Sequence, residues 1–323
     1  MRAIVFEELG GPEVLRVVDL PEPRPGPGEV SVDVAWVGVN FADILARSTG
    51  YRVEGLPFHL GLEVSGRVRE VGADVTGFAP GDEVAAFMDG GGYAEVAVSP
   101  AATVFRIPEG VGLRAGATLP SVLPTAYALL HEVGRLREGD TVLVQGAAGG
   151  VGTVAGQLAR MGGASAVYGV VSRLDKAEHA LKSGYDQVFA TATFDTDVLA
   201  ATGGRGVDIA LDPVGGETFR RTLAVLARFG RLASFGNSGS SEPWTIGPAE
   251  TYPLAKSVAG FSILGMAAAD PQRLREIAEK AFRTVTEGGV ELPVSAEFAL
   301  EDAAQAHRLV ESRTSTGKLL LRV

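Results

Sequence analysis

The chain of 323 residues has the composition of an ordinary globular protein, with 46% hydrophobic and 21% charged residues, and its length favours two domains. Its formal net charge of −10 argues against nucleic acid as a partner, because that binding needs Lys and Arg to neutralise phosphates. The absence of cysteine excludes disulfides, iron–sulfur clusters, thiolate zinc sites and a catalytic thiol.

Histidine spacing and hydropathy extend these exclusions. No two of the four histidines stand at i, i+4 spacing, so we expect no metal site. The first residues resemble a short strand with early charges rather than a signal peptide, and the sequence has no apolar run of roughly 18 residues. We therefore expect a cytoplasmic protein with no membrane partner.

The first 120 or so residues alternate β-rich runs with Gly/Pro turns. The β-rich runs include 30–37, 64–71 and 93–98, and turn-forming sequences occupy 21–28 and 79–82. This pattern predicts a compact and mostly antiparallel β domain.

From about residue 121 the pattern becomes that of alternating strands and helices. We expect helices at 125–133 and 151–161, and strands at 141–144, 166–171, 207–211 and 231–235. Buried strands that alternate with helices predict a parallel, doubly wound sheet. After about residue 265, a helix at 271–287 and an apolar segment at 318–323 predict a return to the first domain.

A glycine-rich run lies between the strand at 141–144 and the helix at 151–161 and has the spacing of a dinucleotide-binding turn. Ala147, Gly149 and Gly152 occupy its three small-residue positions. The amides near Gly150 and Val151 would then face the phosphates at the positive end of the helix dipole. We expect this run to bind a nicotinamide dinucleotide.

The end of the second strand indicates which dinucleotide is bound. Ser172 and Arg173 stand where NAD-binding proteins place an acidic residue, and Lys176 follows one turn later. A hydroxyl and two cations suit the 2′-phosphate of NADPH. Asp175 could pair with either cation instead, and a solvated helix start is the alternative interpretation. We expect NADPH.

Seven motifs in order carry a resemblance to a known family. They are Gly-Val-Asn-Phe-Ala-Asp (38–43), Gly-Leu-Glu-Val-Ser-Gly (61–66), Gly-Asp-Glu-Val (81–84), Ala-Ala-Gly-Gly-Val-Gly (147–152), Asp-Pro-Val-Gly-Gly (212–216), Ser-Phe-Gly-Asn-Ser (234–238) and Thr-Gly-Lys (316–318). The chain resembles the zinc-free quinone oxidoreductase branch of the medium-chain dehydrogenase/reductase superfamily. The resemblance implies a GroES-like catalytic domain (1–121 and 265–323), a Rossmann domain (122–264) and an active site in the cleft between them.

The resemblance also implies roles for residues on the substrate side. Asn40 and Leu62 stand where zinc-dependent relatives place a catalytic cysteine and a histidine. Asn40 is expected to line the substrate and nicotinamide pocket, with turn stabilisation as the alternative. Thr125 is expected to contact the nicotinamide, with helix capping as the alternative. Family members often carry tyrosines near the active site after the Asn40 motif, and of these only Tyr51 remains in this segment.

Further cofactor contacts follow from the same resemblance. Two positions depart from the family pattern, because Leu45 and Ala190 replace tyrosines. The expected contacts are Ser234, Gly236 and Asn237 beneath the adenosine and ribose, Phe261 and Ser262 facing the carboxamide, and Lys318 reaching the cofactor from the C-terminal segment. For Phe261, the alternative is an aromatic side chain packed in an interface strand.

Together these observations predict an NADPH-dependent reductase that transfers hydride to quinones or other conjugated carbonyls without zinc. Asn40 would hydrogen-bond the carbonyl oxygen, and Tyr51 or water would supply the proton. The alternatives are an enoyl-thioester or enone reductase of secondary metabolism, and a non-catalytic, crystallin-like protein that binds NADPH. An apolar sheet edge at 257–264 predicts a homodimer.

Overall fold

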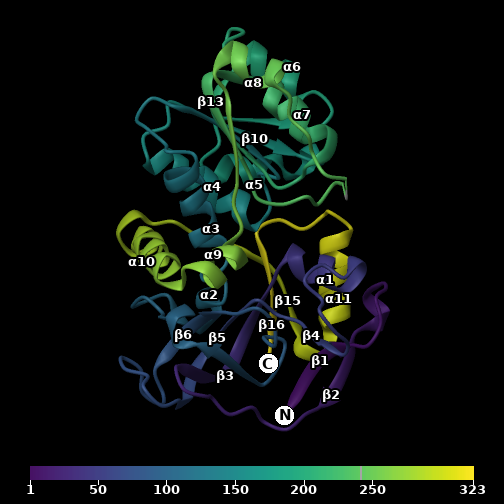
Figure 1. The fold of residues 1–323 in the computed structure, drawn as a ribbon, viewed down its shortest axis with the longest axis vertical. Helices are drawn as coiled ribbons and strands as arrows, with labels where there is room; N and C mark the ends of the chain where they lie inside the picture. Colours follow the sequence, from purple (N-terminus) through teal and green to yellow (C-terminus); the bar gives the residue numbers. More distant parts are fainter. Residues whose placement is uncertain (241) are drawn as a thin grey trace. The chain divides into compact units, whose positions relative to one another are not determined.

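The computed structural model describes residues 1–240 and 242–323 and divides into two compact units, drawn in Figure 1. Unit 1 comprises Met1–Leu123, Met266–Thr286 and Leu292–Val323, and unit 2 comprises Pro124–Gly265 and Glu287–Glu291. The segment after residue 291 thus returns to the unit formed by the first 123 residues.

Unit 1 is built on a seven-stranded sheet within the described residues, in the order β15-β16-β3-β5-β6-β8, with β7 also paired to β3. Its strands are β3 (Glu29–Val39), β5 (Glu63–Val71), β6 (Glu83–Phe87), β7 (Val96–Pro100), β8 (Val104–Arg106), β15 (Val294–Ala299) and β16 (Lys318–Arg322). All pairings are antiparallel except β15 with β16. The predicted antiparallel β domain is confirmed, and the apolar C-terminal segment forms its strand β16.

A smaller sheet and several helices complete unit 1. The sheet has the order β2-β1-β4, and alternating apolar residues such as Val32, Val37 and Leu321 are buried in the core beneath the larger sheet. These elements are β1 (Arg2–Phe6), β2 (Arg16–Asp19), β4 (Phe58–His59), η1 (Pro12–Val14), η2 (Ala101–Thr103), η6 (Leu300–Asp302), α1 (Phe41–Thr49), α2 (Gly112–Gly116), α10 (Pro271–Gly288) and α11 (Ala303–Glu311).

Unit 2 has a six-stranded parallel sheet in the order β11-β10-β9-β12-β13-β14, counted over the described part of the chain. Its strands are β9 (Thr141–Gln145), β10 (Ala166–Val171), β11 (Gln187–Ala190), β12 (Val207–Asp212), β13 (Leu226–Ser234) and β14 (Ser257–Gly260). The strand order reverses between β9 and β12, as in a Rossmann fold. The predicted doubly wound sheet is confirmed.

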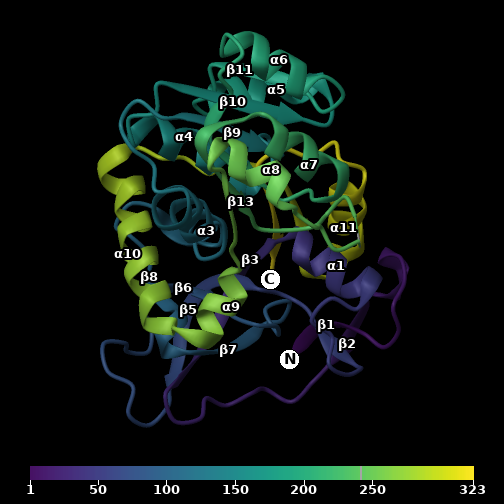
Figure 2. The same ribbon diagram turned by 45° about the horizontal axis from the view of Figure 1, so that its top comes forward.

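Helices connect these strands. Helices α4 and α5 pack together beside β9, β10 and β11, while α6 and α7 pack together beside β11, β12 and β13 (Figure 2). The elements are α4 (Gly150–Met161), η4 (Leu174–Lys176), α5 (Ala177–Lys182), α6 (Phe194–Ala201), α7 (Gly216–Ala224), α8 (Pro248–Thr251) and η5 (Tyr252–Leu254). After β14, α9 (Ile263–Ala269) begins in unit 2 and ends in unit 1.

Two predicted elements differ from the observed ones. The helix expected at 125–133 is instead α3 (Val122–Tyr127) continued by a π-helix, Ala128–Val133, after which the Gly134 amide donates to Leu129 O at 2.8 Å. The apolar edge strand was expected to run from 257 to 264, but β14 ends at Gly260, so its predicted C-terminal bound was wrong. The following residues enter α9, whose last three residues are alanines, the strongest helix formers.

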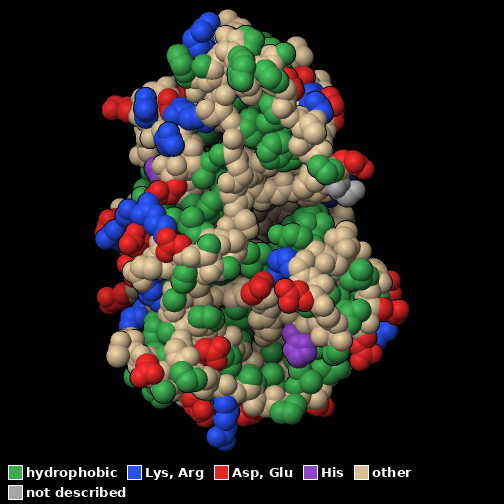
Figure 3. Space-filling model, viewed as in Figure 1, with side chains coloured by type: hydrophobic (Ala, Val, Ile, Leu, Met, Phe, Trp, Pro, Cys, Tyr) green, Lys and Arg blue, Asp and Glu red, His purple; other side chains and the backbone are tan. Residues whose placement is uncertain are grey.

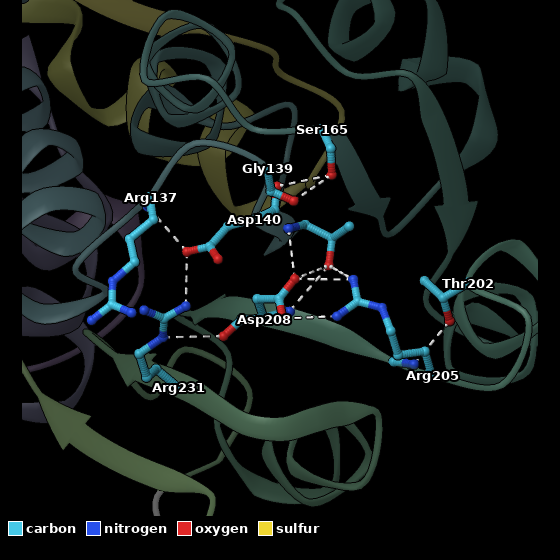
Figure 4. A network of polar contacts seen from close by, with 10 residues as sticks. Arg137, Gly139, Asp140, Ser165, Thr202, Arg205, Asp208 and Arg231 are labelled. Atoms are coloured by element: carbon cyan, nitrogen blue, oxygen red, sulfur yellow. Dashed lines mark hydrogen bonds and ion pairs between the residues drawn. The ribbon is translucent and has the colours of Figure 1, made fainter.

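The amino ends of the unit 2 strands are joined by a polar network (Figure 4). Asp208 accepts hydrogen bonds from the Thr141 amide at 2.9 Å and hydroxyl at 2.8 Å, and Arg205 pairs with the same carboxylate. Arg231 pairs with Asp140 at 2.8 Å. These charged side chains pair with one another at the amino ends of the strands. The loops at the carboxyl ends carry the predicted site residues.

No helix among the described residues has both the length and the apolar character needed to cross a membrane.

Candidate active site

The predicted cofactor residues of unit 2 gather at the carboxyl ends of its parallel strands. In the register of the sheet, Val171 lies opposite Ala190, Asp212 opposite Ser234, and Ser234 opposite Gly260. The loops that leave β9, β10, β12, β13 and β14 therefore all start at the carboxyl end of the sheet. Ligands of open α/β sheets bind at this end, at the point where the strand order reverses.

The loop after β9 has the backbone that a phosphate-binding turn requires. Gly146 has φ of 67°, in the region that favours glycine, and Gly149 is the N-cap of α4. A Cβ at Gly152 would overlap the Gly146 carbonyl oxygen and lie 2.7 Å from the Cα of Ala147. Only glycine therefore allows this close packing of helix on loop. The Gly152 carbonyl accepts a hydrogen bond from the Tyr185 hydroxyl at 2.6 Å, which anchors the turn from below.

The first turn of α4 fits an anionic group. No side chain caps the N-terminus of α4, and the first intrahelical bond runs from the Thr153 amide to Gly149 O at 2.8 Å. The amides ahead of Thr153, including those of Gly150 and Val151, have no intrahelical acceptor. They suit the pyrophosphate of a dinucleotide.

The loops after β12 and β13 meet at glycines and present a buried acceptor. A Cβ at Gly215 would overlap the Asn237 side chain, and one at Gly236 would lie 2.8 Å from Pro213 O. Asn237 Oδ1 is buried and has no hydrogen-bond partner among the described residues. A buried acceptor without a donor is costly, so this atom suits a ligand hydroxyl.

The segment after β14 continues the sheet for one more bond. The Phe261 amide donates to Ser234 O at 2.9 Å, and Ser234 is itself buried. The Ser262 hydroxyl accepts from the Gly265 amide at 3.1 Å, so its side chain stabilises the start of α9.

The loop after β10 carries the residues predicted to bind a 2′-phosphate. Arg173 forms a two-bond pair with Asp175, with Nε and Nη2 at 2.9 and 2.6 Å from Oδ2. The side chains of Arg173 and Asp175 are 57% and 56% exposed. Water therefore screens the ion pair, and separating the two side chains costs little free energy. Ser172 is exposed and Lys176 partly buried. The pairing with Asp175 anticipated from the sequence is thus present in this structure.

A buried polar cluster lies in unit 1 at the end of β3 and the starts of β5 and β16. It consists of Asn40, Glu63 and Lys318, here called the Asn40 cluster. Lys318 Nζ lies 2.5 Å from Glu63 Oε1, 2.9 Å from Asn40 Oδ1 and 2.9 Å from Val39 O. Glu63 and Lys318 are 0% and 3% exposed. The predicted contact of Lys318 with a cofactor stays a prediction, since its three N–H groups are used inside unit 1 here.

Both side-chain N–H groups of Asn40 already donate hydrogen bonds within unit 1. Its Nδ2 donates to Glu63 Oε1 at 2.9 Å and to Gly38 O at 3.2 Å, which accounts for both hydrogens. The predicted donation from Asn40 to a substrate carbonyl is therefore not available in this arrangement. The cluster leaves Asn40 Oδ1 with one further lone pair, so Asn40 can act as an acceptor.

A second buried network supports the backbone of Asn40. Asp43 Oδ2 accepts hydrogen bonds from the backbone N–H of Asn40 at 2.9 Å and from the Tyr93 hydroxyl at 3.4 Å. Tyr93 in turn contacts His307 Nε2 at 3.2 Å, and Arg47 Nε donates to His307 Nδ1 at 3.3 Å. Burial raises the pKa of Asp43 to about 6. Burial and the charge of Arg47 lower the pKa of His307 to about 3.

Thr125 and Tyr51 lie in different units. Thr125 is buried within α3 of unit 2, so the alternative that it caps the helix is wrong. Tyr51 follows the left-handed Gly50 that ends α1 in unit 1, and it is 44% exposed. The sequence prediction missed Glu63, Asp43 and Tyr93, although Asp43 and Glu63 each stand inside one of the quoted motifs.

Comparisons with known proteins identify the family. A GroES-like unit and a Rossmann unit in one chain define the medium-chain dehydrogenase/reductase class. Residues 26–109 match the alcohol dehydrogenase GroES-like domain family, and residues 183–321 match the zinc-binding dehydrogenase family.

Individual relatives narrow this assignment. The chain is 34% identical to a quinone oxidoreductase of Pseudomonas aeruginosa, over 99% of each chain. The chain is 31% identical to Escherichia coli quinone oxidoreductase, whose structure was solved in complex with NADPH. The two structures match over 100% of each chain with a TM-score of 0.93. A highly reducing polyketide synthase of Aureobasidium melanogenum is 31% identical over 98% of this chain and 14% of its own length. The chain belongs to the quinone oxidoreductase branch of the medium-chain dehydrogenase/reductase superfamily, as predicted.

Proposed function

We propose that this protein is an NADPH-dependent reductase that transfers hydride to quinones or other conjugated carbonyls without zinc. The observation that carries the proposal is the full-length relationship to quinone oxidoreductases, combined with a sequence that has Asn40 and Leu62 at the zinc-ligand positions and no cysteine. Without a Lewis acid, an acceptor that is already electron-poor is the favourable partner for hydride.

The residues of unit 2 fit a dinucleotide, which would supply the hydride. The turn containing Ala147 and Gly149 and the amides of Gly150, Val151 and Gly152 would hold the pyrophosphate. Ser234, Gly236 and Asn237 would line the adenosine and ribose, since Asn237 Oδ1 lacks a donor. The remaining contacts proposed for the nicotinamide end are Thr125, Phe261, Ser262 and Lys318.

On the substrate side, unit 1 contributes orientation and a proton path. Asn40 would line the pocket as an acceptor, and Tyr51 or water would supply the proton. Holding the hydride donor at near-attack distance can remove on the order of 7–11 kcal/mol of the barrier at the upper limit. Orientation is therefore the main source of rate enhancement in this proposal.

Replacing Arg173 with alanine tests the cofactor preference. Arg173, Ser172 and Lys176 are proposed to bind the 2′-phosphate, so Kd for NADPH should rise about tenfold, corresponding to about 1.4 kcal/mol. Kd for NADH should change less than twofold. Titration by nucleotide fluorescence measures both constants, and Arg160→Ala, which breaks an exposed ion pair with Asp186, is the matched control. Equal losses for the two nucleotides would show that the phosphate lies elsewhere.

A second function within the class is an enoyl-thioester or enone reductase. The relationship to a polyketide synthase over 98% of this chain favours it as the alternative. NADPH oxidation with a panel of quinones, enones and enoyl thioesters separates these acceptors by kcat/KM. Tight NADPH binding without turnover on any of them would instead support a non-catalytic, crystallin-like protein.

We also propose a homodimer that forms through β14. This strand is the outer strand of its sheet, and the nearby Tyr252 is 79% exposed. The face shown in Figure 3 carries both acidic and basic side chains, most of them toward its outline. We propose a small-molecule acceptor as the partner, rather than nucleic acid or a membrane, and a cytoplasmic location stays a prediction.

A further inference from the structure

The Asn40 cluster contains an ion pair that is almost completely withdrawn from water. Such a pair is costly to bury, and replacement by apolar side chains of similar volume is often neutral for stability. Lys318 and Glu63 are 255 positions apart in the sequence, and both side chains turn their charged ends toward Asn40. The pair therefore calls for an explanation other than stability.

Chemistry fixes which way the Asn40 amide points. An ammonium group can only donate hydrogen bonds, and a carboxylate can only accept them. Lys318 therefore faces Oδ1 of Asn40, and Glu63 faces Nδ2, at 2.9 Å in both cases. Rotating the amide by 180° would place oxygen against carboxylate and nitrogen against ammonium.

Packing holds Glu63 in place on its other sides. The Ser121 amide donates to Glu63 Oε2 at 2.9 Å, so both carboxylate oxygens are bound. A Cβ at Gly38 would lie 2.5 Å from Glu63 Oε1 and 2.6 Å from Ala117 O, so the strand can carry only glycine beside the carboxylate. The carboxylate has no room to leave the Asn40 amide.

We propose that Glu63 and Lys318 are positioning residues that present Asn40 Oδ1 as a fixed acceptor for a hydroxyl group of the bound reactants. This inference rests on the proposed function and refines it, since Asn40 receives a hydrogen bond instead of donating one. The hydroxyl belongs either to the cofactor ribose or to the acceptor in its reduced form. A Kd measurement for NADPH distinguishes these two sources.

The test replaces both charges with apolar side chains of similar length, Glu63→Met and Lys318→Met together. The fold should persist, with Tm within a few degrees of the wild type. We expect kcat to fall at least tenfold. Kd for NADPH should rise at least tenfold if the hydroxyl is on the ribose and stay within threefold if it is on the acceptor. A kcat within twofold of the wild type would overturn the proposal.

Glu83→Gln provides a control, because it removes the partner of a different ion pair in unit 1, that of Arg67, which belongs to neither network around Asn40. It should leave kcat unchanged.

A double-mutant cycle covers the case in which the double methionine variant fails to fold. Asn40→Ala removes the acceptor, and Lys318→Met removes the ammonium that faces Asn40 Oδ1 at 2.9 Å. If Lys318 acts through Asn40, the double variant should lose no more kcat than Asn40→Ala alone. If its loss equals the product of the single losses, the proposal is wrong.

A spectroscopic readout separates this proposal from the proposed function. The Nδ2 hydrogens of Asn40 should exchange slowly with solvent in the wild type and rapidly in the double methionine variant, as measured by ¹⁵N NMR. Unchanged exchange would overturn the positioning role. A wild type that binds NADPH but reduces no acceptor would overturn the proposed function, and this NMR test would still decide the positioning role.

Discussion

Replacing Gly149 with alanine should weaken NADPH binding at least tenfold while changing the stability of the free protein by no more than about 1 kcal/mol. Gly149 has an ordinary φ of −81°, and an added Cβ would meet only the Gly146 carbonyl oxygen, at 3.4 Å. The free protein can therefore accommodate the methyl group. The same methyl group would occupy the surface that the backbone offers to a pyrophosphate.

Gly152→Ala is the matched variant, and it should behave in the opposite way. Its Cβ would overlap backbone atoms of the preceding turn, so the free energy of unfolding should fall by about 1–3 kcal/mol or more. Urea unfolding measures stability for both variants, and nucleotide titration measures Kd. Equal destabilisation by the two substitutions, or normal NADPH binding by Gly149→Ala, would contradict the assignment of this turn to the cofactor.

His307 should make the protein markedly less stable in acid. Its pKa is lowered from 6.5 to about 3 by burial and by Arg47, so the unfolded chain binds a proton that the native state refuses. Stability from this residue is complete above pH 6.5 and is lost as the pH falls toward 3. The loss can reach about 5 kcal/mol, from 1.36 kcal/mol per pH unit.

Asp43 opposes this trend over a narrower range. Its pKa is raised from 3.8 to about 6, so its contribution is present below pH 3.8 and is lost as the pH rises through 6, by about 3 kcal/mol at most. Between about pH 4 and pH 6 the two slopes are equal and opposite, so these two residues should leave the net stability nearly unchanged there. Their net contribution should rise with pH only below pH 3.8 and between pH 6 and pH 6.5. Urea unfolding as a function of pH measures the slope.

Two variants isolate the two contributions. His307→Gln removes the titrating ring and should make the stability fall between about pH 4 and pH 6, whereas Asp43→Asn should make it rise over the same range. The comparison rests on slopes, because each substitution also changes stability at neutral pH. A slope for His307→Gln equal to that of the wild type would show that acid sensitivity arises elsewhere.

The sequence predicted the parallel sheet because strands such as β9 and β12 have apolar centres, Val-Leu-Val (142–144) and Ile-Ala-Leu (209–211), which suit a strand buried on both faces. The glycine turn was predictable for a related reason, since Gly152 fills a position where any side chain would clash. Local patterns of this kind follow from the residues themselves.

Other features depend on contacts that no local pattern contains. The π-helix after Tyr127 has six residues, too few to distinguish its period from that of an α-helix. The Asn40 cluster joins the ends of three strands, so neither the burial of Lys318 nor its partners could be predicted from its sequence neighbours. The same holds for His307, a lone histidine on α11 whose partners lie on other elements.

Transfer of hydrogen from NADPH deuterated at C4 of the nicotinamide tests whether this protein passes hydride to a conjugated carbonyl. In a single turnover with an enone acceptor, we expect a slower reaction than with unlabelled NADPH and a product that carries deuterium on the β-carbon. With a quinone we expect the same slowing, because the C–D bond at C4 breaks in the hydride transfer whichever atom of the quinone receives the deuterium. Tight binding of the nucleotide with no deuterium transferred to any conjugated carbonyl would contradict the proposed function.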